Sequence, residues 1–250
     1  MVARTRRGER PAVGSPRAGG LFVRLLPPGE PAALNSYVYV HVCCLNHWRD
    51  VFASLIHKIK DSGLYDVVKG IRCGVVGEDV DASAFDDPKI SIVRRSHDVT
   101  LYETSTLNLL YEHAQREEFN VLYVHTKGVS YGPDSNRFAN VRDWVEYLGH
   151  FNIYRHRTCR ALLHTHDAVG VNLQGGENED DALHYSGNFW WSKASYLRTL
   201  NPCEQTSHNA PEFWLTETRA GSYVSLWTSG VDHYQEPYPA SRYVGQEALA

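Results

Sequence analysis

The sequence predicts an α/β fold in which a mostly parallel β-sheet is flanked by helices. Short runs rich in Val, Ile and Tyr, which are typical of buried strands, alternate with stretches whose apolar residues recur at helical spacing. Strands and helices that alternate at this interval favour parallel strands with helices on both faces of the sheet. With 250 residues, of which 42% are hydrophobic, the chain is long enough to bury a sizeable core.

Each element is predicted from its own local pattern. Short apolar runs indicate strands at 36–44, 71–77, 89–93, 121–124 and 168–173. Helical spacing of apolar residues indicates helices between Asn46 and Gly63, over about 102–117 and over roughly 138–164. The last third is denser in aromatic residues and turns, with segments 184–191, 211–215 and 223–227 and a short helix from Lys193. That change of character is expected of a half that faces a substrate.

Residues 1–35 are predicted to be a disordered tail. The first 20 residues contain five Arg and one Glu among Gly and Pro, and no apolar segment follows that could form a secretory signal. The Arg-rich, acid-poor composition also fits an organelle transit peptide, and the sequence leaves that alternative open. Residues 36–250 are predicted to form a single domain.

Charge and cysteine content exclude several classes of protein. The net charge of −4 gives no reason to expect a nucleic-acid partner. The five cysteines are odd in number and form no C-x-x-C pair, so neither a zinc ribbon nor a disulfide framework is indicated. No run of 18 apolar residues occurs, so no transmembrane segment is predicted. A reducing, cytoplasmic location is the simplest expectation.

The end of the fourth predicted strand is the first candidate for chemistry. The run 120–124 leads directly into His125, Thr126, Lys127 and Gly128. In open α/β sheets ligands bind outside the carboxyl ends of the strands. Lysine is a compact cation that suits phosphate, so this strand end predicts an anionic ligand.

Two later segments carry the other candidates. In the first, Ser186, Gly187 and Asn188 precede Phe189-Trp190-Trp191, and flat aromatic faces beside hydrogen-bonding groups suit a sugar ring. Because side chains alternate along a strand, one of the two tryptophans is expected to pack in the core. In the second, Ala210-Pro-Glu-Phe-Trp214 places the carboxylate of Glu212 among aromatic residues, as a candidate general base.

In this order and spacing, the segments HTKG, SGNFWW and EFW resemble nucleotide-sugar glycosyltransferases of the GT-A fold. The similarity is greatest to a group from bacteria and large DNA viruses, and it extends over roughly residues 36–234. The resemblance implies a GT-A-like domain with a nucleotide-binding half at 36–130 and an acceptor-side half at 165–240. It implies transfer of a sugar from a UDP- or GDP-sugar to a hydroxyl acceptor, expected to be a glycan, by a hexosyl- or pentosyltransferase in glycan biosynthesis.

The resemblance also suggests roles for individual residues. Glu212 matches the inverting base, and Lys127 would stabilise the leaving diphosphate. The donor-binding residues would be His125, Thr126, Lys127, Arg94 and Arg142, and the residues that bind the sugar or the acceptor would be Ser186, Gly187, Asn188 and Trp190.

The strand end departs from most GT-A enzymes at the metal site. Where those enzymes carry an Asp-x-Asp that holds a divalent metal, this chain has His125-Thr126-Lys127, without a carboxylate. Mg²⁺ and Mn²⁺ prefer oxygen ligands, so the tripeptide disfavours a metal cofactor. We expect Lys127 to take the place of the metal in a metal-independent, inverting reaction.

Other interpretations remain open at this point. Glu212 could pair with an arginine such as Arg219 instead of acting as a base. The whole domain could be a non-catalytic module that binds carbohydrate or nucleotide. The segment His164-Thr-His166-Asp167 could belong to a metallohydrolase, although its i, i+2 histidines lack the i, i+4 spacing that places two ligands on one helical face.

Overall fold

A computed structural model of the chain describes residues 34–176 and 181–246. The tail expected at 1–35 lies outside these residues except for its last two. Asn35 already opens the first strand, one residue earlier than expected.

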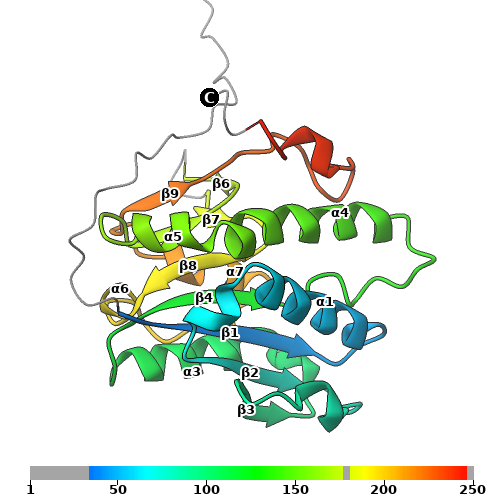
Figure 1. The fold of residues 1–250 in the computed structure, drawn as a ribbon, viewed down its shortest axis with the longest axis horizontal. Coiled ribbons are helices and arrows are strands. Elements are labelled where there is room, and N and C mark those ends of the chain that lie inside the picture. Colours follow the sequence, from blue (N-terminus) through cyan, green and yellow to red (C-terminus); the bar gives the residue numbers. More distant parts are fainter. Residues whose placement is uncertain (1–33, 177–180, 247–250) are drawn as a thin grey trace, which may run out of the picture.

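A mixed seven-stranded sheet forms the centre of the fold, which confirms the predicted α/β class (Figure 1). The strand order is β3-β2-β1-β4-β8-β5-β9. All neighbouring pairs are parallel except β4–β8 and β8–β5, so β8 alone runs against the other six. The strands are β1 (Asn35–Cys43), β2 (Gly70–Val76), β3 (Ile90–Ser96), β4 (Phe119–His125), β5 (Ala168–Gly170), β8 (Trp190–Lys193) and β9 (Tyr223–Ser225), and β6 (Leu173–Gln174) pairs with β7 (His184–Tyr185) outside the sheet.

Helices cover both faces of the sheet. Figure 1 shows α1, α4 and α5 in front of the strands and α3 behind them. The helices are α1 (Trp48–Asp61), α2 (Leu64–Val67), α3 (Thr104–Ala114), α4 (Phe138–Gly149), α5 (His156–Leu162), α6 (Ala194–Leu197) and α7 (Ala210–Phe213). No helix of the described residues is both long enough and apolar enough to cross a membrane.

The buried strand β1 shows why the central runs are apolar along their whole length. Val38, Val40 and Val42 pack in the core on the α1 and α4 side, whereas Tyr37 and Tyr39 belong to the core on the α3 side. Alternate side chains of a strand point to opposite faces, and both faces of this sheet are covered. A strand in this position therefore has no face exposed to solvent.

The long helix expected over 138–164 is interrupted, and this prediction was wrong. A π-helical turn, His150–Tyr154, separates α4 from α5. The indole N–H of Trp191 donates to the carbonyl of Asn152 at 2.8 Å, and the Asn152 amide donates to the Leu148 carbonyl at 3.0 Å. Side chains that enter the backbone ladder in this way distort a helix.

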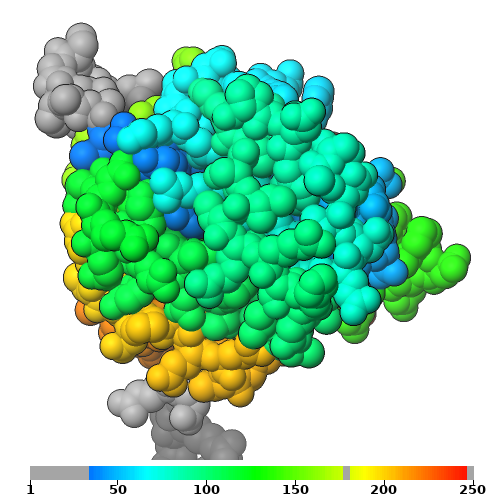
Figure 2. All heavy atoms as spheres, turned by 90° about the horizontal axis from the view of Figure 1, so that it is seen from below, coloured from blue at the N-terminus to red at the C-terminus, as the bar shows by residue number. Residues whose placement is uncertain are grey.

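Strand β3 forms one edge of the sheet, and its surroundings make up the face seen in Figure 2, where residues near 90 are teal. Most side chains of β3 are exposed, including that of Arg94. The opposite end of the order, β9, is parallel to β5. The carboxyl ends of β1, β4, β5 and β9 and the amino end of β8 therefore lie at the same edge of the sheet, where the candidate site is found.

Candidate active site

A cavity of about 240 Å³ lies at the carboxyl ends of β1 and β4. Its walls come from the segments that follow β1 and β4, the turn before β8, the start of α3, the helix α7 and Tyr234. It brings together five residues that the sequence singled out: His125, Thr126, Lys127, Asn188 and Glu212. The expectation that polar groups from distant segments meet at this strand edge is therefore consistent with the structure.

Thr126 fastens the ends of β1 and β4 to each other. Its N–H donates to the His41 carbonyl at 3.0 Å, and its hydroxyl accepts from the N–H of Cys43 at 2.9 Å. Its side chain is buried, with 3% exposed. Thr126 therefore holds the cavity wall in place.

Lys127 carries the cation of the cavity. Its ammonium lies 3.8 Å from the centre of the Trp144 ring and 5.9 Å from that of Tyr234, a cation–π arrangement. Burial lowers the pKa of Lys127, and the negative charges of Glu212 and Glu103 oppose that effect. No ion pair joins Lys127 to a carboxylate within the described part of the chain. The ammonium is thus held by aromatic rings and remains available to an anion.

The turn before β8 needs the residues Gly187 and Asn188. Both have left-handed backbone conformations, with φ of 95° and 54°, which Gly adopts freely and Asn tolerates better than most residues. A Cβ on Gly187 would come within 2.7 Å of Leu148 Cδ1 and 3.1 Å of the Trp144 ring. The pair therefore allows the chain to pass close to α4 before it enters the sheet.

The peptide of Gly187 connects two of the candidate site residues. Its N–H donates to Glu212 Oε1 at 2.8 Å, and its carbonyl accepts from His125 Nε2 at 3.1 Å. Within the described residues, the second oxygen of Glu212 accepts no hydrogen bond. The carboxylate is held at one oxygen and open at the other, as a base toward a substrate hydroxyl requires.

Two histidines of the cavity, His41 and His125, are neutral at pH 7. Burial lowers the pKa of His125 to about 3 and that of His41 to about 4. A carbonyl can only accept, so Nε2 of His125 carries the ring proton and Nδ1 presents a lone pair. Lys127 is the only lysine or arginine among the described residues that line this cavity.

Glu103 is a cavity residue that no sequence motif indicates. Its Oε2 accepts from the Tyr123 hydroxyl at 2.7 Å and from Asn188 Nδ2 at 2.8 Å, and its Oε1 lies 3.8 Å from His125 Nδ1. It precedes α3, and the start of a helix that follows a parallel strand falls at the ligand-binding edge. Its position just before a helix that follows a parallel strand is the feature of the sequence that could have indicated it. The preceding residue, Tyr102, has a strained φ of 43°, as often occurs at functional sites.

A second cavity of about 450 Å³ adjoins the first and shares Glu212 and Tyr234 with it. Ser186, another predicted residue, lines this second cavity. The other lining side chains are mostly polar: Asn172, Gln174, His184, Thr228, Ser229, Asp232 and His233, with Trp144. No Lys or Arg of the described residues contributes, and burial lowers the pKa of His233 to about 4. The lining suits a neutral polar ligand.

Besides Ser186 and Gly187, three predicted residues do not line the main cavity: Trp190, Arg94 and Arg142. Trp190 is 1% exposed, stacks on Tyr123 and donates its indole N–H to Asn188 Oδ1 at 2.8 Å, so it supports the site from the core. Trp191 is also buried, because both faces of the sheet are covered. Arg94 lies on the exposed edge strand, and Arg142 lines a separate cavity of about 300 Å³ that shares Lys127.

The residues present do not fit a bound divalent cation. The two carboxylates of the main cavity are Glu103 and Glu212, and each accepts hydrogen bonds from the described part of the protein at one oxygen only. Within the described residues, no three His, Cys, Asp or Glu side chains converge in a way that could hold a metal ion.

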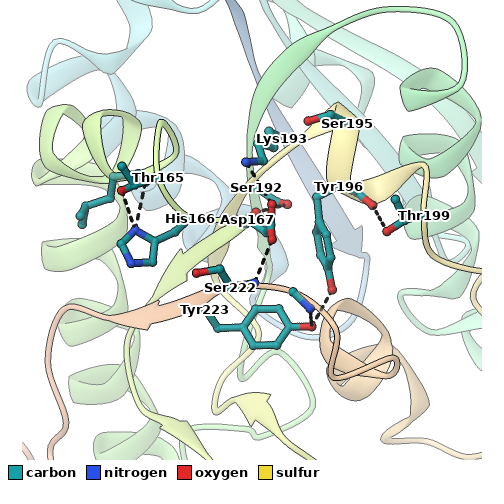
Figure 3. A network of polar contacts seen from close by, with 12 residues as sticks. Thr165, His166, Asp167, Ser192, Lys193, Ser195, Tyr196, Thr199, Ser222 and Tyr223 are labelled. Atoms are coloured by element: carbon teal, nitrogen blue, oxygen red, sulfur yellow. Dashed lines mark hydrogen bonds and ion pairs between the residues drawn. The ribbon is translucent and has the colours of Figure 1, made fainter.

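The segment around Asp167 is likewise no metal centre. Asp167 pairs with Lys193 at 3.0 Å and accepts from the N–H of Ser222 at 2.8 Å (Figure 3). The ring of His166 instead contacts the Thr165 hydroxyl and the Leu162 carbonyl. The metallohydrolase interpretation is therefore wrong for the described residues.

Comparisons with known proteins give a family and similarities to solved structures. A crystal structure from Desulfovibrio desulfuricans G20, of a protein provisionally named a nucleotide-diphospho-sugar transferase, is 10% identical with a TM-score of 0.36. The similarity covers 77% of this chain and 80% of that one. No curated protein matches the sequence. The family model of a domain of unknown function, DUF8361, matches residues 68–236, more than half of the chain, and the protein therefore belongs to that family.

Proposed function

We propose that the protein is a glycosyltransferase that moves a sugar from a nucleoside-diphosphate sugar, such as a UDP- or GDP-sugar, to a hydroxyl of a glycan. The proposal depends mainly on one observation: Lys127 and Glu212 line the same cavity at the carboxyl edge of the sheet. The ammonium of Lys127 contacts aromatic rings and no carboxylate of the described residues, and only one oxygen of Glu212 accepts a hydrogen bond from them. The arrangement agrees with the GT-A-like motifs of the sequence.

Lys127 acts on the leaving group in this proposal. As the bond between the anomeric carbon and the diphosphate breaks, negative charge grows on the diphosphate oxygen. An ammonium held in place before the reaction stabilises that charge without reorganisation. Binding of the diphosphate also favours the charged form of Lys127, which burial alone disfavours. No step requires a metal ion.

Glu212 acts on the acceptor. The acceptor lies in the second cavity, so that one hydroxyl reaches the open oxygen of Glu212 at the boundary of the two cavities. The carboxylate takes the hydroxyl proton while the acceptor oxygen forms its bond to the anomeric carbon and the diphosphate departs. Attack from the side opposite the leaving group gives inversion.

The test is turnover of a panel of UDP-, GDP- and TDP-sugars, alone and with oligosaccharide acceptors, in excess EDTA. Release of a nucleoside diphosphate together with a new glycoside supports the proposal. Nucleotide binding without release across the panel would identify a non-catalytic binding module instead. Activity that EDTA abolishes and Mn²⁺ restores would contradict the metal-independent step.

A further inference from the structure

Glu103 and His125 place two hydrogen-bond acceptors side by side in the main cavity, and no donor from the described residues lies between them. Nδ1 of His125 carries a lone pair, because Nε2 uses the ring proton to donate to the Gly187 carbonyl. Oε1 of the Glu103 carboxylate lies 3.8 Å away. Two acceptors this close repel each other unless a group with hydrogens to donate binds to them.

The other oxygen of Glu103 explains why the pair stays in place. Oε2 accepts from the hydroxyl of Tyr123 and from the amide of Asn188, and both of these groups are buried. Asn188 is in turn fixed by the Trp190 indole at 2.8 Å. The carboxylate therefore cannot turn away from His125 without losing two hydrogen bonds, and the pair is preorganised for a ligand.

We propose that Glu103 Oε1 and His125 Nδ1 together bind neighbouring hydroxyl groups of the sugar that is transferred. The inference rests on the proposed function and adds to it the part of the donor that these residues recognise. A sugar ring offers hydroxyl donors on adjacent carbons, whereas the diphosphate offers only acceptors and would be repelled here. The diphosphate therefore belongs at Lys127 and the sugar beside Glu103.

The substitution Glu103→Gln tests the pair without removing its supports. In the variant, the Tyr123 hydroxyl and the Asn188 amide hold the glutamine oxygen where Oε2 was. The glutamine NH₂ group then faces His125 Nδ1 and can donate a hydrogen bond to it. The sugar then loses both acceptors, and we expect kcat/KM for the preferred donor to fall about 10- to 100-fold, while the Kd of the bare nucleoside diphosphate changes less than about twofold.

Glu117→Gln is the matched control. That carboxylate lies beyond the other end of α3 and accepts from the Tyr37 hydroxyl at 2.9 Å, outside the cavity. The same change of carboxylate to amide there should leave donor recognition unaltered. Thermal melting of both variants checks that they fold.

Deoxyfluoro analogues of the donor give a second measurement, because fluorine cannot donate a hydrogen. At least one such replacement should lower kcat/KM of the wild type for the donor about 10-fold. The same replacement should lower kcat/KM of Glu103→Gln little further, because the variant has already lost the acceptors. The inference is overturned if Glu103→Gln keeps the wild-type preference for nucleotide sugar over bare nucleotide, or if no replacement affects the wild type. If the wild type binds no nucleoside diphosphate at all, the proposed function fails as well, so the two failures are distinguishable.

Discussion

The main-chain N–H of Gly187, in the turn before β8, donates to the carboxylate of Glu212, on helix α7, at 2.8 Å. This bond fixes one oxygen of a carboxylate whose residue lines both cavities, and the other oxygen accepts no hydrogen bond within the described residues. The proposed base is thus positioned by the backbone of the turn before β8. Several consequences can be measured.

Glu212→Gln should remove the base but keep its position. The amide oxygen can still accept from Gly187, whereas the side chain can no longer take a proton. We expect transfer to slow about 10²- to 10⁴-fold, with donor binding nearly unchanged. Rapid-quench measurement of a single turnover separates the two effects. Glu217→Gln, a carboxylate on the same segment that accepts from the N–H of Asn201, is the control, and equal losses in both variants would contradict the assignment.

Lys127→Met should remove the cation and keep a side chain of similar length over Trp144. We expect the turnover rate to fall about 10²- to 10³-fold, because the charge on the leaving diphosphate is no longer stabilised. Affinity for the free nucleoside diphosphate, measured by calorimetry, should fall as well. Lys193→Met is the control, since Lys193 pairs with Asp167 at the opposite edge of the sheet. Unchanged turnover in Lys127→Met would rule out its role.

Gly187→Ala should damage both stability and catalysis. The new Cβ meets Leu148 at 2.7 Å in a backbone conformation that alanine rarely adopts, with an expected loss of about 1–3 kcal/mol. Gly63→Ala is a matched control, because Gly63 also has a positive φ of 76° but has no atom within 4 Å of its Cβ position. Urea denaturation measures the loss in the free energy of unfolding of each variant. The loss in Gly63→Ala reports the effect of the positive φ alone, and any further loss in Gly187→Ala reports the contact with Leu148. Equal losses would show that the contact is harmless.

Stability should fall as the pH drops below about 6.5. The pKa is about 3 for His125 and about 4 for His41 and His233, all lowered by burial. These histidines bind protons near pH 6.5 in the unfolded chain, but only near pH 3 to 4 in the folded protein. The free energy of unfolding is therefore greatest above pH 6.5 and declines toward pH 4. Each group contributes a loss of about 2 kcal/mol between pH 7.5 and pH 5.

Urea denaturation at the two pH values measures this loss. His41→Gln should reduce the difference between them by about 2 kcal/mol, because it removes one of the three groups. A free energy of unfolding that stays constant between the two pH values would mean that the folded and unfolded states take up equal numbers of protons. These rings would then be protonated at pH 5 in the folded protein as well, contrary to the prediction.

The sequence predicted the elements whose pattern is local. The strand that ends at His125 was predicted because an apolar run leads directly into polar residues. The shared cavity of Lys127 and Glu212 was anticipated from motif order. What local pattern could not provide was the break after Gly149, which depends on the hydrogen bond from Trp191, 39 residues from its partner Asn152.

The candidate site was predictable only in part for the same reason. Glu103 has no motif around it, and its place in the cavity depends on Tyr123 and Asn188, which are distant in sequence. Trp190 was expected beside a sugar, yet the side of β8 on which it lies is covered by the core packed around α3. Arg94 was expected near the donor, but β3 is two strands away from β1.

The reversed direction of β8 also bears on how this protein could be engineered. Because β8 enters the sheet at the cavity and leaves it at the opposite edge, the connection from β8 into α6 lies far from Lys127 and Glu212, beside the start of β4. Ser195 there contacts Glu118 and no cavity residue. A fluorescent reporter or an immobilisation tag placed at that edge would leave both cavities open, and binding of each candidate substrate could then be followed on the same labelled protein.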